Sequence, residues 1–375
     1  MLMLIIRYIE GNLMVKKYKI AVYAISKNEE KNVYRWYEAM KEADEIYVLD
    51  TGSDDKTVTI LKELGVHVSR VKIEPWRFDE ARNKALEMVS DEIDICVSTD
   101  LDEVFLPGWY EKIQEIWTDD TTRLKYTYNW QLEEDRPVVS FLYDKIHARH
   151  GYKWIYPVHE VLSRINNHEV VKIDKGIVLN HYPDRLKSRS YYLDLLELSV
   201  REDPENDRNM HYLGREYMYN KEWDKCINTL KKHLTLKKAT WIPERAASMR
   251  FIARSYQAMD NISLARMWYK KAIDEDPSLR DGYVELAILE YHQGNYLEVI
   301  NNLILAKSIK LHELIYINEP FSWDYTIDNL LSVVYYNLGL YDEALYYIDK
   351  ALMHDKDNEM LISNKEIIMK EKESN

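Results

Sequence analysis

The hydrophobic pattern of the chain changes near residue 180, and this change limits the possible folds more than any other feature. Before it, short apolar runs alternate with amphipathic stretches of about 10 residues, which predicts βαβ units and a largely parallel sheet. We predict strands over 19–25, 45–49, 66–73 and 93–99, and helices over 30–41, 56–64 and 79–89. Longer runs rich in Tyr, Val and Ile over 123–130, 138–149 and 170–180 predict an antiparallel or mixed extension.

After residue 188 the pattern is almost entirely helical and repeats itself. Each copy has a turn residue, an aromatic or aliphatic residue two positions later, and a small residue three positions further on. The turns start at Lys221, Asp260, Gly294 and Gly339, so the copies lie 39, 34 and 45 residues apart. A two-helix unit of 34 residues is the period of tetratricopeptide repeats, and the alternative is an irregular helical bundle. Residues 190–201 would form a half-repeat and residues 360–370 a capping helix.

Length and charge narrow the class of protein. A chain of 375 residues is expected to form two domains. Its net charge of -13, with no basic run, argues against nucleic acid or an anionic membrane as the main partner. The two cysteines, Cys96 and Cys226, lie in apolar segments and are expected to be core residues in a reducing cytosol. We therefore expect a cytoplasmic protein.

The N-terminal residues are expected to lie outside the first domain. Residues 1–6 are apolar but far shorter than a membrane span, and no basic residue precedes them as in a signal peptide. Met14 precedes the first good strand, so residues 1–13 are interpreted as an upstream extension. The predicted division is an extension over 1–17, an α/β domain over 18–187 and a helical domain over 188–375.

An acidic cluster follows the strand predicted over 93–99. Asp100, Asp102 and Glu103 stand where a buried strand ends, which is costly without a positive charge nearby. A divalent cation with oxygen ligands, water and a phosphorylated substrate would supply that charge. A solvated loop that caps the next helix is the alternative. Two further D-x-D patterns, at 274–276 and 355–357, lie at predicted helix ends, where solvated acids are ordinary.

The ends of the first two strands also carry polar residues. Asp50 ends the second strand, on the edge that Asp100 shares, and can accept hydrogen bonds from the N–H groups of a nucleobase. Helix capping accounts for Asp54 or Asp55 but not for Asp50. Residues 24–26, which include Ala24 and Ser26, could line a flat base, although capping by Ser26 or Asn28 is the simpler role.

Three other positions invite a functional interpretation. Arg82 lies in the first turn of a predicted helix, where a cation is unfavourable unless a diphosphate or Asp100 is near. An exposed Arg82 paired with Glu80 or Glu87 is the alternative. His159 and His181 each follow an aromatic or aliphatic stretch, and a lone histidine there is more often structural than a ligand.

Several of these motifs occur together and in the order typical of one family. They are Ile-Ser-Lys-Asn-Glu-Glu at 25–30, Asp-Thr-Gly-Ser-Asp-Asp-Lys-Thr at 50–57, Phe-Asp-Glu-Ala-Arg-Asn at 78–83 and Thr-Asp-Leu-Asp-Glu at 99–103. In this order the chain resembles inverting family-2 glycosyltransferases of the GT-A fold. Pro-Val-His-Glu at 157–160 and His-Tyr at 181–182, followed by tetratricopeptide repeats, resemble a bacterial subgroup of that family. The resemblance spans about residues 18–360, and Thr51 and Leu101 depart from commoner residues without removing a carboxylate.

The resemblance implies a role for each matching residue. Asp50 would hold the nucleotide base together with Ala24 and Ser26, and Asp100 would contact the ribose or a metal-bound water. Asp102 would bind Mn²⁺ or Mg²⁺, with His181 as a further ligand. Arg82 would help the metal to stabilise the departing nucleoside diphosphate. The general base would be Glu160, with Glu103 or His159 as alternatives.

The implied fold is an α/β GT-A domain followed by an all-α tetratricopeptide-repeat superhelix. The implied function is metal-dependent, inverting transfer of a sugar from a UDP-sugar to a protein, peptide or glycan acceptor that the repeats recruit. A non-catalytic repeat protein with a vestigial sugar-nucleotide domain is the main alternative. A nucleotidyltransferase is disfavoured because its glycine-rich phosphate loop is missing from the sequence. The sugar, the acceptor and the oligomeric state stay open.

Overall fold

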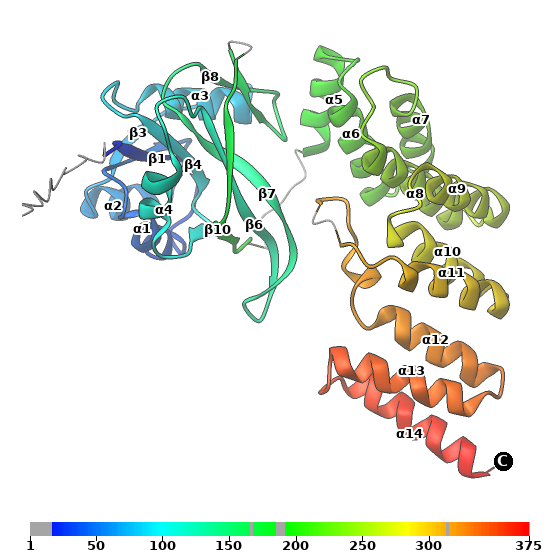
Figure 1. The fold of residues 1–375 in the computed structure, drawn as a ribbon. Helices are drawn as coiled ribbons and strands as arrows, with labels where there is room; N and C mark the ends of the chain where they lie inside the picture. Colours follow the sequence, from blue (N-terminus) through cyan, green and yellow to red (C-terminus); the bar gives the residue numbers. More distant parts are fainter. Residues whose placement is uncertain (1–16, 166–167, 185–191, 313–314, 375) are drawn as a thin grey trace, which may run out of the picture.

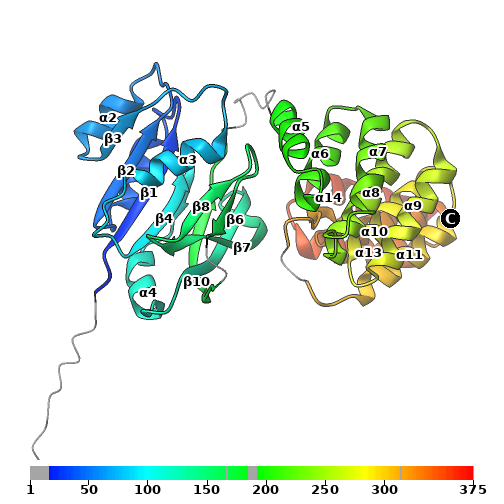
Figure 2. The ribbon, with the colours of Figure 1, turned by 90° about the horizontal axis from the view of Figure 1, so that it is seen from above.

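The α/β and helical halves predicted from the sequence form two separate domains (Figures 1 and 2). The computed structural model describes residues 17–165, 168–184, 192–312 and 315–374. The interpretation of residues 1–13 as an upstream extension lies outside the described residues. No helix in the described part of the chain is both long and apolar enough to cross a membrane.

The α/β domain is built on an eight-stranded mixed sheet in the order β3-β2-β1-β4-β7-β6-β10-β5. Strands β3, β2, β1 and β4 are parallel, β7 pairs antiparallel with both β4 and β6, and β10 is parallel to β6. The mixed extension predicted from the later strands is therefore confirmed. The strands are β1 Ile20–Ser26, β2 Glu45–Asp50, β3 His67–Arg70, β4 Ile95–Asp100, β5 Glu103–Phe105, β6 Arg123–Glu133, β7 Arg136–Ala148 and β10 Val171–His181, with a separate hairpin of β8 Tyr152–Ile155 and β9 Val161–Arg164.

Four helices belong to this domain: α1 Val33–Met40, α2 Thr57–Glu63, α3 Phe78–Glu87 and α4 Trp109–Ile116. Helix α1 buries Trp36 against the sheet, and the Trp36 indole N–H donates to Thr99 Oγ1 of β4 over 3.0 Å. The predicted helix over 30–41 begins later, at Val33, because Asn32 N first closes a turn on Glu29 O. Helix α4, β5 and the β8–β9 hairpin were not predicted from the sequence.

The helical domain is a series of antiparallel helix pairs. It comprises α5 Tyr192–Glu202, α6 Asp207–Tyr219, α7 Trp223–His233, α8 Ile242–Ala258, α9 Ile262–Glu275, α10 Arg280–His292, α11 Tyr296–Ser308, α12 Thr326–Asn337, α13 Tyr341–His354 and α14 Glu359–Ser374. Helices α5 and α14 stand where the half-repeat and the capping helix are predicted, and residues 190–191 lie outside the described part.

The turns inside the four helix pairs share one backbone conformation. Lys221, Asp260, Gly294 and Gly339 have φ angles of 61°, 59°, 73° and 73°. Each of these residues separates the two helices of one pair, and they are the four positions that the sequence alignment placed in register. Because a left-handed residue is uncommon outside glycine, its recurrence at these four positions confirms the repeat period.

Two buried histidines, one in each domain, predict how stability changes with acidity. Burial lowers the pKa of His147 and of His211 to about 3. In unfolded chains the imidazole pKa is about 6.5, so each group contributes stability above that pH and loses it as the pH falls toward 3. We expect His147→Gln to reduce the slope of the unfolding free energy against pH between about pH 6 and pH 4, by the equivalent of up to one bound proton. His150→Gln, at an exposed position, is the control in urea unfolding across that range, and equal slopes for both variants would contradict the prediction.

Candidate active site

The polar ends of the central strands meet at one edge of the sheet. In the parallel pairing, Ser26 of β1 lies beside Asp50 of β2, and Ile25 lies beside Asp100 of β4. Strands β2 and β4 therefore end at the same edge of the sheet, as predicted for Asp50 and Asp100. Ligands of open α/β sheets bind at this carboxyl edge, so its side chains define the candidate site.

Arg82 of α3 joins two of the predicted residues. Its Nη2 donates to both oxygens of Asp100 at 2.9 Å, and its Nε donates to Glu160. Burial alone would lower the pKa of this guanidinium, but the charges of Asp100 and Glu160 outweigh it and raise the pKa well above its usual value. The structure thus places Arg82 with Asp100, and Lys84 is the residue that pairs with Glu80.

Lys145 of β7 is a second buried cation at this site. Its Nζ lies 3.5 Å from Asp100 Oδ2 and 3.6 Å from Glu103 Oε1. Burial raises the pKa of Asp100, but the charges of Arg82 and Lys145 more than reverse this and hold it well below its usual range. Lys145 was not predicted from the sequence. Its position between Tyr143 and His147, on one face of a strand that faces inward, was a usable signal.

Glu103 is buried beneath the cluster and both of its oxygens are engaged. Oε1 accepts a hydrogen bond from the Tyr128 hydroxyl at 2.8 Å, and Oε2 accepts one from the Asp100 backbone N–H at 2.9 Å. Burial raises the pKa of this carboxyl group. These bonds fix the turn that carries Asp100 and Asp102.

Asp102 and His181 form a carboxylate–imidazole pair with 3.6 Å between Oδ2 and Nε2. The Tyr182 N–H donates to the Asp102 carbonyl at 2.8 Å, which ties the end of β10 to the acidic turn. His181 Nδ1 lies 3.1 Å from the carbonyl of Trp130, and the two rings stack with centroids 4.5 Å apart. A proton on Nδ1 would leave the lone pair of Nε2 free to bind a cation shared with the Asp102 carboxylate, the arrangement usual for a metal-binding histidine.

These two residues fit a hard divalent cation. Octahedral ligands about 2.1 Å from an ion lie about 3 Å apart, so the 3.6 Å spacing needs little adjustment. In the described residues no group of three or more His, Cys, Asp or Glu side chains is arranged to hold a metal. Mg²⁺ commonly takes one or two protein ligands and completes its shell with water and substrate phosphates. Asp100 is less suited, because Arg82 and Lys145 already share its oxygens.

Asp50 lies fully buried at the end of β2 and organises its own loop. Its Oδ1 accepts from the N–H groups of Gly52 and Ser53 at 3.2 and 3.0 Å and from Arg70 Nε at 3.0 Å. Ser26 Oγ lies 3.3 Å from the other oxygen, and Ala24 is buried in the core below. The structure therefore brings the three predicted base-binding residues together, with Asp50 turned into the protein.

Side-chain hydrogen bonds join the loop after β1 to the loop that precedes α2. Asn28 has a left-handed φ of 56°, and its side-chain oxygen accepts from the Asp54 N–H at 2.9 Å. Asp55 accepts from the N–H of Thr57, in the first turn of α2, at 2.9 Å. Asp55 therefore pairs with the first amide of α2, whereas the helix-capping role expected for Asn28 is wrong, because Asp54 precedes α2 and α1 begins only after Asn32.

His159 points away from the acidic cluster although Glu160 belongs to it. The His159 ring stacks on Tyr212 of α6 with centroids 4.0 Å apart, and the His159 carbonyl accepts from Arg208 at 3.2 Å. Its φ of 49° turns the chain between these two neighbours. His159 therefore sits at the junction of the two domains.

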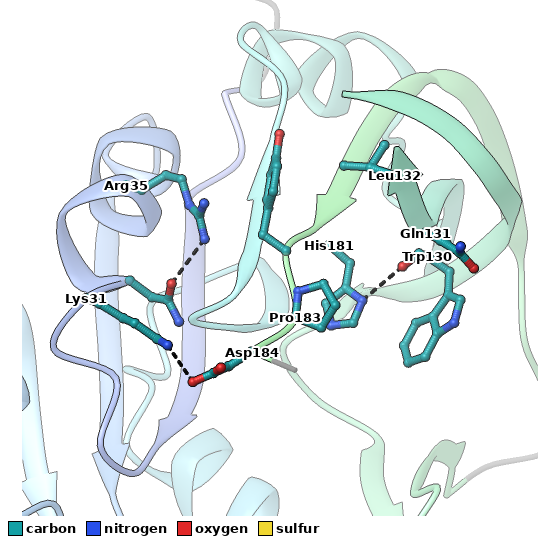
Figure 3. A pocket seen from close by; sticks show the side chains of 10 residues that line it. Lys31, Arg35, Trp130, Gln131, Leu132, His181, Pro183 and Asp184 are labelled. Carbon is teal, nitrogen blue, oxygen red and sulfur yellow. Dashed lines mark hydrogen bonds and ion pairs between the residues drawn. The ribbon is translucent and has the colours of Figure 1, made fainter. Parts of the chain in front are cut away.

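A pocket of about 750 Å³ opens beside the Asp102–His181 pair. Figure 3 shows His181 and Trp130 on one side and Lys31 and Arg35 of the α1 region on the other. The Arg35 guanidinium lies 4.4 Å from the centre of the Tyr182 ring, and Lys31 pairs with Asp184 at 2.5 Å. Neither cation was predicted from the sequence, although two basic residues four positions apart on a predicted helix lie on one face.

Comparisons with known proteins match one protein family and several solved structures. Residues 22–137 match the model of the glycosyl transferase family 2. The crystal structure of MamA is 22% identical, covers 44% of this chain and 86% of its own, and has a TM-score of 0.36. A tetratricopeptide-repeat protein of Thermus thermophilus is 16% identical, covers 47% of this chain and 88% of its own, and has a TM-score of 0.34. No curated protein matches the chain.

The family match covers strands β1 to β6, together with Asp50, Arg82, Asp100 and Asp102. The helix pairs and their recurring left-handed turns lie further along the chain, after residue 191. Residues 22–137 therefore carry a glycosyl transferase family 2 domain, most of β7 and β8–β10 follow it, and from residue 192 the chain is an all-helical region of the tetratricopeptide-repeat type.

Proposed function

We propose that this protein transfers a sugar, with inversion, from a UDP-sugar to a protein, peptide or glycan acceptor, and that it requires Mn²⁺ or Mg²⁺. The observation that carries the proposal is the Asp102–His181 pair at the carboxyl edge of a glycosyl transferase family 2 domain, beside a pocket with two cationic side chains. Family 2 enzymes use nucleotide-sugar donors. An ion held by this pair would supply positive charge to the donor diphosphate as it departs.

The chain's own cations have distinct roles in the proposal. Lys31 and Arg35 line the pocket and are placed to bind the anionic part of the donor. Arg82 holds Asp100 and Glu160 in fixed positions, because it bonds to both and is itself almost fully buried. Because these charges are already in position, the site does not have to reorganise when the reaction occurs. Such preorganised electrostatic stabilisation of the transition state is usually the largest contribution to catalysis.

Glu160 is our choice for the general base that takes the acceptor proton. Both oxygens of Glu103 accept hydrogen bonds, and the His159 ring is stacked on Tyr212. Glu160 uses only Oε1, and its Oε2 has no hydrogen-bond partner among the described residues. A positioned base contributes about 10²–10⁴-fold to such a proton transfer. The acceptor would approach from the domain junction that begins at His159.

Calorimetric titration of UDP, with and without Mn²⁺, tests this function. We expect UDP to bind at least about tenfold more tightly with Mn²⁺, since the ion would bridge the protein and the diphosphate. Titration of uridine alone is the control and should show no dependence on the metal. Metal-independent or absent UDP binding would contradict the proposal and favour a non-catalytic repeat protein.

A further inference from the structure

The connection between α11 and α12 is unusual among the links between helix pairs. It accounts for the longest repeat spacing, 45 residues, and Figure 1 shows it in orange beside α8 and α10. Its residues 315–319 contact α6, α8 and α10, which are the first helices of three consecutive pairs. A single short stretch of chain therefore crosses three repeats.

An aromatic side chain anchors one end of this stretch. The Tyr316 hydroxyl donates to Glu244 of α8, and the ring packs against Tyr212 and Trp241 with centroids 5.8 and 5.4 Å apart. Burial raises the pKa of the Tyr316 hydroxyl well above its usual value, so it stays protonated and donates. The site thus requires an aromatic ring that carries a hydrogen-bond donor.

The remaining contacts bind the main chain and a carboxylate. Arg250 Nη2 donates to the Ile317 carbonyl at 2.8 Å, and Asp281 Oδ1 accepts from the Glu319 N–H at 2.6 Å. Arg254 Nη2 donates to the Glu319 carboxylate at 2.5 Å. These bonds engage one backbone carbonyl, one backbone N–H and one side-chain carboxylate of residues 317–319. A groove that binds an extended peptide makes bonds of the same kind.

The surface that these residues form keeps unused hydrogen-bonding capacity. Among the described residues, Arg250 Nε, Asp281 Oδ2 and His211 Nε2 are buried and have no hydrogen-bond partner. Buried polar atoms in native proteins are nearly always paired, and each exception calls for an explanation. The contacts with residues 315–319 therefore leave these three polar atoms without a hydrogen-bond partner.

We propose that this surface, formed by Tyr212, Glu244, Arg250, Arg254 and Asp281, binds an extended peptide of another protein. The peptide carries a tyrosine followed three positions later by an acidic residue, the chemistry that Tyr316 and Glu319 present. In the unbound protein, residues 315–319 occupy the surface and compete with that peptide. The surface is then free in only a fraction of the molecules, so the apparent dissociation constant of the peptide is the intrinsic constant divided by that fraction.

The test uses a fluorescent peptide with the sequence of residues 315–321 and the full-length protein. We expect it to bind Tyr316→Ala/Glu319→Ala at least about tenfold more tightly than the wild type, because the variant no longer competes for the surface. Fluorescence anisotropy measures both dissociation constants. Equal affinity for the two proteins, or no binding to the variant, would overturn the proposal.

Two controls separate recognition from a folding defect. A peptide in which the residue matching Glu319 is glutamine leaves the protein unchanged and should bind at least about tenfold more weakly, through loss of its bond to Arg254. In the double variant, Arg254→Gln should also weaken binding at least about tenfold, whereas Arg266→Gln, which breaks an ion pair with Glu290, should not. Should the double variant be unfolded by circular dichroism, Glu319→Gln alone replaces it under the same criteria. Equal loss from both arginine substitutions would count against the assigned surface.

Discussion

Replacing Asp102 with asparagine should abolish sugar transfer while the fold stays intact. The substitution removes the negative charge that faces His181 and that we propose binds the metal. Stabilisation of a departing diphosphate by a bound cation is worth several kcal/mol, and each 1.36 kcal/mol is tenfold in rate, so we expect a loss of about 10³-fold or more. The side chain is 22% exposed, and among the described residues its only charged partner is His181 at 3.6 Å, so thermal unfolding should change little.

Transfer rates and UDP calorimetry with Mn²⁺ would be measured on the same preparations. Asp355→Asn is the matched control, because it changes an aspartate of another D-x-D pattern that lies at the exposed end of α13. This variant should retain full activity and metal-dependent UDP binding. An Asp102→Asn protein that kept more than about a tenth of the wild-type rate would refute the assignment of Asp102.

Replacing Arg82 with methionine should strongly destabilise the α/β domain. Arg82 is 4% exposed, and its removal leaves Asp100 and Glu160 without their shared cation. Breaking a buried ion pair in this way typically costs about 3–5 kcal/mol. Urea unfolding followed by tryptophan fluorescence would measure the change in the transition of this domain, and activity should be lost as well.

The same variant has a characteristic dependence on pH. In the wild type the pKa of Asp100 lies below its unfolded value of about 3.9, so its stabilising effect is present above that pH and lost as the pH falls through the folded pKa. Without Arg82 the pKa of Asp100 rises, so the carboxyl group takes up a proton more readily. The destabilisation should therefore shrink toward about pH 4.

Arg266→Met is the matched control for Arg82→Met. Arg266 pairs with Glu290 and is 31% exposed, so solvent weakens the pair and we expect a loss of no more than about 1 kcal/mol. A loss of that size for Arg82→Met would show that Arg82 does not hold the acidic cluster together.

Local patterns in the sequence were enough to predict both halves of the protein. The strands β1, β2 and β4 are continuous apolar runs, and parallel pairing requires that their carboxyl ends share one edge. Asp50 and Asp100 could therefore be placed together before any coordinates. The repeat period was equally readable, because Lys221, Asp260, Gly294 and Gly339 mark turns that local chemistry imposes.

The partners of the site residues could not be predicted in this way. Lys145 reaches Asp100 from β7, which pairs with β4 although 35 residues separate the end of β4 from the start of that strand. Glu160 reaches Arg82 across a gap of 78 positions. Nothing in the local sequence around Arg82 distinguishes Glu160 from Glu80 or Glu87 of its own helix.

The sequence by itself determined where the strands, the helices, the repeat turns and the acidic strand end lie. These features depend on hydrophobic periodicity, turn conformation and strand direction, which act over a few residues. Only the tertiary structure decided that Asp100 is neutralised by two buried cations, that Asp102 faces His181, and that residues 315–319 cover three repeats. Those contacts depend on how distant segments pack, because a buried charge or a spare hydrogen bond is satisfied by whichever partner the fold brings within reach.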